Sequence, residues 1–376
     1  MYTMEQVLEV AVPLRQLLHE NPEAPEQEFK TREILKNFLR ENTSLELVEH
    51  ERWFYAIHRE EGAKETIAFR ADHDAIISED GKAFHGCGHD GHSAILAATA
   101  MYLEGRTVGN NIVFLFQHAE ENGAGAKECV ALFDEVHVDR IYGLHNIPGL
   151  PLKTLCTKPG PLQCASTGMI VEVEGKQSHA SEPENGINPV YALSSLVREL
   201  EPLSLFRGFG PIDEDPFHFK GLVLCTIVSL RVGEQGAFGV SPSRARLEMT
   251  VRAVFDEDLT ALIDWIKARM EELAKEKGLK LSFDFSDTFP DTVNDEKITE
   301  HWFKVMEAAG FETLRLENPV RASEDFGAYL KKKPGCYFYV GDGDHADVHT
   351  IEYDFPDEII ETGIKAFCAL AESHLE

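Results

Sequence analysis

The fold is decided by three neighbouring stretches: TIAFRADHD (66–74), SAILAATAMYLE (93–104) and NIVFLFQHAEE (111–121). The first and third begin as short runs rich in β-branched and aromatic residues, which favour strands. The second is rich in alanine and leucine, which favour a helix. A helical pattern at 126–133 and a strand-like run, RIYGL (140–144), continue the alternation. Strands that alternate with helices predict an α/β fold, a mainly parallel sheet with helices on both faces.

The periodicity changes between residues 167 and 287. Strands are predicted at 169–175, 221–232, 245–255 and 279–285, and helices at 188–201 and 258–277. This order predicts a compact α+β domain with helices on one face of its sheet.

The flanking sequence returns to the first pattern. Amphipathic helices are predicted at 4–19 and 29–41, and a strand at 336–340 is followed by a helix at 357–373. We therefore expect one domain made of residues 1–166 and 288–376. The α+β domain, residues 167–287, is inserted into it.

Composition excludes several classes of protein. The chain has 376 residues, more than one hydrophobic core usually supports, so two domains are expected. It carries 36 Lys+Arg against 65 Asp+Glu, a net charge of −29. This field repels nucleic acid and anionic membrane surfaces, so neither is expected as a partner.

The location is predicted from the termini and the cysteines. The N-terminal segment lacks the basic start and apolar core of a signal peptide, and no apolar run is long enough to span a membrane. The seven cysteines are scattered and odd in number, which favours reduced thiols. A cytoplasmic protein is expected.

Polar side chains follow each predicted strand of the parallel sheet. Ligands bind at the carboxyl ends of such strands, so these residues should share one edge. They are Asp72-His73-Asp74, His118 with Glu120-Glu121, His145, and His345 with Asp347 and His349, and the glycine-rich HGCGHDGH (85–92) precedes a helix at the same edge. Taken singly, each has an ordinary structural explanation: Asp90, for example, could be a helix N-cap. Together they predict a metal site.

The ligand types narrow the chemistry. No HExxH motif, four-cysteine cluster, phosphate-binding loop or GxSxG elbow is found in the sequence. Adjacent glutamates suit a division of labour in which one binds metal and its neighbour accepts a proton from water. Two ions about 3.5–4 Å apart need roughly five or six protein ligands, and the inventory is of that size.

The sequence resembles the dinuclear metal-dependent aminoacylase and carboxypeptidase family. The matching branch contains hippurate hydrolases, auxin-conjugate amidohydrolases and N-acetyl-diaminopimelate deacetylases. The matching motifs, in chain order, are RQLLHENPE (15–23) with Glu28 and Thr31, FRADHD (69–74), HGCGHDGH (85–92), QHAEE (117–121), GLHN (143–146), GKQSHA (175–180), SEDF (323–326), and His349 with YDF (353–355). The resemblance implies a zinc-peptidase-like catalytic domain, residues 1–166 and 288–376. It also implies that the inserted domain, residues 167–287, is a lid that could mediate homodimerisation.

The resemblance also assigns roles. It implies two divalent ions (Zn, Mn, Co or Ni) held by five ligands, of which Cys87 bridges the ions: Cys87, His89, Glu121, His145 and His349. Glu120 matches the general base and Asp74 the supporting aspartate. His179, in the inserted domain, matches a histidine that stabilises the oxyanion, in some relatives from a partner subunit. Asp72 stands where other branches have a histidine ligand.

The sequence departs from the family at positions that concern the substrate. His73 stands where Met or Ile is usual, and Ile76-Ile77 replaces Leu-Pro. In the inserted domain an asparagine is missing from the segment 238–242, and Met249-Thr250 replaces Gly-Thr before Arg252. Arg252 could pair with a substrate carboxylate or form a structural ion pair.

We therefore expect an amidohydrolase that cleaves the amide bond of N-acyl amino acids. Two alternatives remain: a dipeptidase or carboxypeptidase that uses the same site, and an inactive relative that binds acyl amino acids.

Overall fold

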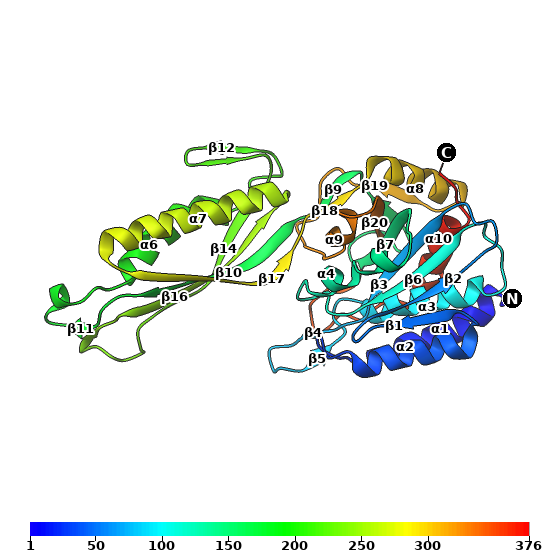
Figure 1. Ribbon diagram of the computed structural model, residues 1–376, viewed down its shortest axis with the longest axis horizontal. Helices are drawn as coiled ribbons and strands as arrows, with labels where there is room; N and C mark the ends of the chain where they lie inside the picture. Colours follow the sequence, from blue (N-terminus) through cyan, green and yellow to red (C-terminus); the bar gives the residue numbers. More distant parts are fainter. Residues whose placement is uncertain (376) are drawn as a thin grey trace. The chain divides into compact units, whose positions relative to one another are not determined.

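The computed structural model describes residues 1–375, which form two compact units (Figure 1). Unit 1 comprises residues 1–162, residues 292–318 and the C-terminal segment from Glu324; unit 2 comprises Gln163–Asp291 and Pro319–Ser323. The predicted domain boundaries, 166/167 and 287/288, stay predictions.

Unit 1 is built on an eight-stranded sheet. Its strands, in spatial order, are β1 (Glu46–Glu49), β2 (Phe54–His58), β6 (Asn111–Gln117), β3 (Thr66–Asp72), β7 (Arg140–Ile147), β20 (Gly335–Gly341), β8 (Leu155–Thr157) and β19 (Thr313–Arg315). The central strands β6, β3, β7 and β20 are all parallel to one another. The predicted fold class, a mainly parallel α/β sheet, is confirmed.

Helices cover both faces of this sheet, as the alternation of side chains along the strands requires. On one face, Phe69 of β3 packs on Phe367 with ring centroids 4.7 Å apart, and Phe338 of β20 packs on Trp302 at 5.2 Å. Tyr337, next to Phe338 in the strand, points the other way and packs on Phe326 at 4.8 Å.

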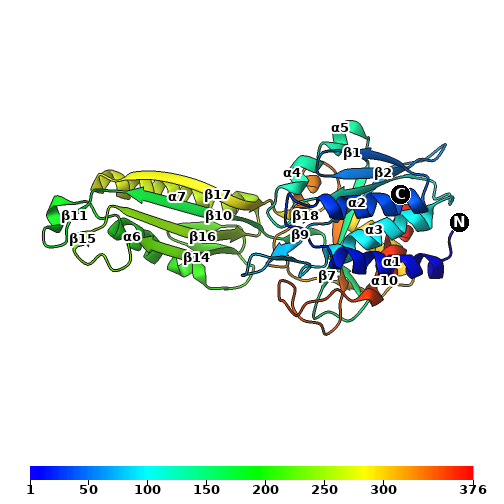
Figure 2. The ribbon, with the colours of Figure 1, turned by 90° about the horizontal axis from the view of Figure 1, so that it is seen from below.

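The helices of unit 1 are visible in Figures 1 and 2. They are α1 (Met4–His19), α2 (Phe29–Asn42), α3 (His89–Leu103), α4 (Gly125–Cys129), α5 (Leu132–Glu135), α8 (Glu296–Ala308), α9 (Gly327–Leu330) and α10 (Ile360–Ala371). The single helix predicted over 126–133 is wrong: the chain forms two short helices, α4 and α5. Within residues 1–375, no helix is both long and apolar enough to cross a membrane.

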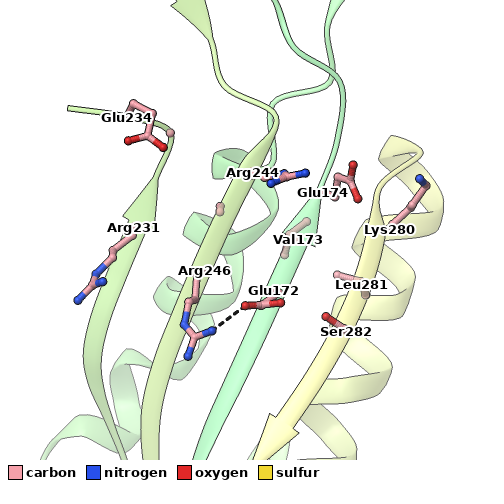
Figure 3. A pocket seen from close by; sticks show the side chains of 12 residues that line it. Glu172, Val173, Glu174, Arg231, Glu234, Arg244, Arg246, Lys280, Leu281 and Ser282 are labelled. Carbon is pink, nitrogen blue, oxygen red and sulfur yellow. Dashed lines mark hydrogen bonds and ion pairs between the residues drawn. The ribbon is translucent and has the colours of Figure 1, made fainter. Parts of the chain in front are cut away.

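Unit 2 is the α+β domain that the sequence predicts. Its four-stranded antiparallel sheet has the order β14 (Val223–Val232), β16 (Arg244–Ala253), β10 (Ala165–Glu174) and β17 (Lys280–Phe289). Helices α6 (Val190–Leu200) and α7 (Asp256–Lys277) cover one face. The other face carries charged side chains, such as Arg246, which donates to Glu172 at 2.6 Å (Figure 3).

A buried ion cluster joins the strands of unit 1 at the carboxyl edge of the sheet. Arg70 of β3 is 1% exposed and contacts three carboxylates: Asp72 at 2.5 Å, Asp325 at 2.7 Å and Glu324 at 3.0 Å. Its Nε donates to Gln117 at the end of β6. Burial alone would raise the pKa of Asp72, but the neighbouring His89 and Arg70 lower it well below its usual range.

Replacing Arg70 by methionine should destabilise the protein strongly. Removing one partner of a buried ion cluster typically costs about 3–5 kcal/mol, because the remaining charges stay buried and unpaired. Urea unfolding at pH 7 measures the loss. Because the pKa of Asp72 is lowered in the folded state, the stabilisation is present above about pH 4 and fades as the pH falls through the lowered pKa.

Arg315→Met is the matched control. Arg315 pairs with Glu300 at 2.7 and 2.8 Å, but both side chains are about half exposed, so the loss should stay within about 1 kcal/mol. Equal losses in the two variants would contradict the structural role of Arg70.

Candidate metal centre

The glycine-rich segment places two of the predicted ligands by a tight turn. Gly88 has φ of 100° and is the N-cap of α3, so Cys87 lies just outside the helix and His89 is its first residue. A Cβ at Gly88 would lie 2.3 Å from Oδ1 of Asn146, so no side chain fits there. The helix thus starts four residues before the predicted position.

Asp90 is not the helix cap. It lies inside the first turn of α3, where its carboxylate accepts a hydrogen bond from Nδ1 of His19 at 2.8 Å. Arg15 lies 3.7 Å from the same oxygen. Asp90 therefore ties α1 to α3 beside the ligand segment.

The loop after β6 delivers the paired glutamates. Ala119 adopts a left-handed backbone conformation, with φ of 48°. Glu120 and Glu121 follow it, and the backbone N–H of Glu121 donates to Oδ2 of Asp74 at 2.9 Å. Asp74, which follows β3, therefore fixes the second glutamate directly.

The five predicted metal ligands lie together. Sγ of Cys87 is 3.4 Å from Nε2 of His145 and 3.3 Å from Nε2 of His349. Oε1 of Glu121 is 3.6 Å from Nε2 of His349 and 3.7 Å from Nε2 of His89. The ligand atoms form two groups that share Cys87: one with His89 and His145, the other with Glu121 and His349.

Hydrogen bonds orient the ligand histidines. Nδ1 of His89 lies 3.0 Å from Oδ1 of Asp74, and Nδ1 of His145 lies 2.6 Å from the carbonyl oxygen of Asn146. Each oxygen accepts the Nδ1 proton, so the lone pair of each Nε2 is directed at the ligand groups. His349 is held by its backbone, whose N–H donates to the carbonyl of Gly86 at 2.6 Å.

The residues fit divalent cations. Nε2 of His89 and Oε1 of Glu121 are buried without a hydrogen-bond partner, which is costly unless a cation occupies the space between them. Burial raises the pKa of Glu121 to about 7, and burial with Glu324 raises that of Glu120 well above its usual range. Both carboxyls lack a counter-charge that a metal would supply. Nitrogen, carboxylate and thiolate donors suit zinc and its neighbours.

The site is buried on one side and open on the other. The side chain of His89 is 1% exposed and that of Glu121 13%, whereas that of His349 is 55% exposed. A small molecule can therefore approach past His349.

Several other residues that the sequence placed at this edge make contacts outside the two groups that contain Cys87. Asp72 is paired with Arg70 and with Nδ1 of His92 at 2.7 Å, and it also forms a group of possible ligands with His89 and His92. His118 pairs with Glu128 at 3.3 Å. No group of three or more close ligand atoms within residues 1–375 includes His345 or Asp347.

Two predicted residues lie in unit 2. His179 is on β11 (Ser178–His179), with Nδ1 2.7 Å from the Ser181 hydroxyl. Arg252 of β16 donates to the carbonyl of Arg321 at 2.7 Å and to the hydroxyl of Ser323 at 2.5 Å. These partners are neutral oxygens, so the structural ion pair considered for Arg252 is not found among the described residues. The catalytic and substrate roles of both stay predictions.

Sequence reasoning missed the supporting residues. Arg70 lies within an apolar strand, and Glu324 and Asp325 follow no predicted strand, although the SEDF motif contains both. Asp325 accepts from Gln117 and from the N–H of Ala126, and its own N–H donates to Glu120 at 3.3 Å. The family motifs FRADHD and SEDF, which contain these three residues, are the only signal in the sequence that points to them.

Comparison with known proteins identifies the family of this chain. The family model described as peptidase family M20/M25/M40 matches residues 60–373. N-acetyldiaminopimelate deacetylase from Bacillus velezensis is 28% identical over 94% of this chain and 95% of that protein. Hippurate hydrolase from Campylobacter jejuni is 26% identical over 96% of each. The solved structure of a dinuclear metal-binding M20 peptidase from Bacillus subtilis is 25% identical, covers 98% of both chains and has a TM-score of 0.80.

These findings confirm the resemblance and the fold that it implied. The chain belongs to peptidase family M20/M25/M40.

Proposed function

We propose that the protein is a metal-dependent amidohydrolase that removes the acyl group from N-acyl amino acids. The observation that carries this proposal is the pair Glu120–Glu121. Glu121 lies in the ligand group with Cys87 and His349, whereas Glu120 belongs to neither group that contains Cys87. Glu120 shares a group with His89 and Glu121, and its Oε1 accepts the backbone N–H of Asp325. The full-length relatives, a deacetylase and a hippurate hydrolase, support N-acyl amino acids as the substrate class.

The metal ions would be held by the two groups that share the Cys87 thiolate. The ligands are Cys87, His89, Glu121, His145 and His349. When bound, two divalent ions polarise the substrate carbonyl and acidify a water molecule. The native ion could be Zn, Mn, Co or Ni. The choice among them depends on the metals available in the cell as much as on the ligand atoms.

Glu120 is the general base in this proposal. Oε1 accepts the backbone N–H of Asp325, and Oε2 lies 3.9 Å from Nε2 of His89, so the second oxygen faces the ligand groups. A carboxylate in this position can take the proton from the attacking water and deliver it to the leaving nitrogen. Asp74 acts through others: it accepts from Nδ1 of His89 and from the N–H of Glu121 and so orients both ligands.

His179 and Arg252 complete the proposed machinery. The N–H of Ser181 donates to Nδ1 of His179 at 3.2 Å, which leaves the ring proton of a neutral imidazole on Nε2. His179 can therefore donate to the developing oxyanion. Burial lowers the pKa of Arg252, but a guanidinium stays protonated in proteins, so Arg252 can pair with the substrate carboxylate.

Location and assembly form the remaining part of the proposal. All seven cysteines are free and buried, which supports a reducing, cytoplasmic environment. A homodimer through unit 2 is supported by the edge strand β14, whose Val228 is 64% exposed.

The dipeptidase or carboxypeptidase alternative uses the same residues, and the family name covers peptidases. An inactive binding relative is disfavoured because the ligand groups and Glu120 are all in place.

Changing each of the two adjacent glutamates to glutamine should separate catalysis from metal binding. Glu120→Gln should lower kcat by about 10²–10⁴-fold, the usual contribution of a general base, while the chain still holds two ions. Glu121→Gln makes the same change one residue on and should weaken metal binding at least ~10-fold, since it removes a charged ligand. Steady-state kinetics and metal analysis of both variants measure this. Normal turnover in Glu120→Gln would contradict the mechanism.

A substrate panel should distinguish the alternatives. N-acetyl, N-benzoyl and longer N-acyl amino acids, assayed with added Zn, Mn or Co, should be hydrolysed, and a chelator should abolish turnover reversibly. Dipeptides with a free α-amino group should be poor substrates. A requirement for that amino group would favour the dipeptidase, and a chain with two bound ions but no turnover on any amide would favour the binding relative.

A further inference from the structure

The loop that carries the paired glutamates depends on a strained residue. Ala119 is fully buried and has φ of 48°, a conformation that costs a non-glycine residue roughly 1–2 kcal/mol. It stands directly before Glu120. Its carbonyl accepts the N–H of Gly125 at 2.9 Å, which closes the loop.

A distant carboxyl group holds Ala119 in this conformation. Oε1 of Glu28, 91 residues earlier in the chain, accepts the N–H of Ala119 at 2.7 Å. Glu28 is 4% exposed. Burial and the nearby Asp74 raise its pKa to about 8, so at neutral pH it is mainly the uncharged acid, whose carbonyl oxygen accepts the bond.

This carboxyl has no helix-capping role. Glu28 is the N-cap residue of α2, yet its side chain makes no capping hydrogen bond. Capping is left to Glu23, whose carboxylate accepts both the N–H and the hydroxyl of Thr31, at 2.7 and 2.9 Å. The contact with Ala119 is thus the interaction that explains a buried acid at position 28.

We propose that Glu28 is a positioning residue for the catalytic loop, and this rests on the proposed function. By holding the N–H of Ala119, it fixes the left-handed turn that sends Glu120 and Glu121 to the ligand groups. Without that bond, Ala119 relaxes to negative φ, the following peptide rotates, and the contacts of Glu121 with Asp74 and of Glu120 with Asp325 are lost. Misplacement of catalytic groups by about 1 Å can cost 10²-fold in rate.

Four variants test this role: Glu28→Gln, Glu28→Ala, Ala119→Gly and the double variant Glu28→Ala/Ala119→Gly. Glutamine keeps a neutral acceptor oxygen, so its kcat and metal affinity should stay within about threefold of wild type. Alanine removes the acceptor, so kcat should fall about 10–100-fold and metal should bind about 10-fold more weakly, with KM nearly unchanged. Glycine adopts positive φ without strain, so the double variant should recover most of both losses.

Glu23→Ala is the matched control. It removes a half-buried acceptor from the same segment and should lower the melting temperature without changing kcat or metal affinity. Should Glu28→Ala not fold, Glu28→Met fills the space without accepting a hydrogen bond and takes its place, alone and with Ala119→Gly.

The outcomes are separable. Unchanged kcat in Glu28→Ala, or a double variant no better than Glu28→Ala, overturns the positioning role. Wild-type protein that hydrolyses no amide refutes the proposed function instead, while the metal affinities of the variants, measured by competition with a chromogenic chelator, still test Glu28.

Discussion

At the carboxyl edge of the sheet in unit 1, buried carboxyl groups outnumber the cationic side chains that could balance their charge. The candidate metal site follows from this excess of negative charge. Buried charges must be paired or bind metal. Arg70 pairs with Asp72, Glu324 and Asp325, although its single charge balances only one of the three carboxylates. Glu120 and Glu121 lie next to this cluster without a guanidinium of their own, which agrees with a place for divalent cations. The ion cluster and the proposed metal centre therefore both offset the charge of buried carboxylates at this edge.

The sheet edge could be predicted because parallel strands must end together. Asp74, Glu121 and His145 each follow or end an apolar strand, and the structure brings all three to the predicted edge. The same reasoning could not distinguish His345 and Asp347 from His349, because order along a loop does not say which side chain turns inward. His349 turns inward through a positive φ of 65°, a local feature that no periodicity records.

The supporting residues could not be predicted by pattern alone. Arg70 sits in a strand whose residues are all buried, so it resembles part of the core. Two of its three carboxylate partners come from far along the chain, 255 residues away in the case of Asp325. Glu28 resembles an ordinary acid at a helix start. Tertiary contacts decide the roles of both, and only the family motifs drew attention to the segments that contain them.

The central claim is that five side chains hold two ions and share the Cys87 thiolate. Anomalous diffraction at the zinc edge, from crystals of the zinc-loaded protein, tests this most directly. The account predicts two peaks in each chain, about 3.5–4 Å apart, both about 2.3 Å from Sγ of Cys87. A single peak, or two peaks of which only one contacts Cys87, would contradict it.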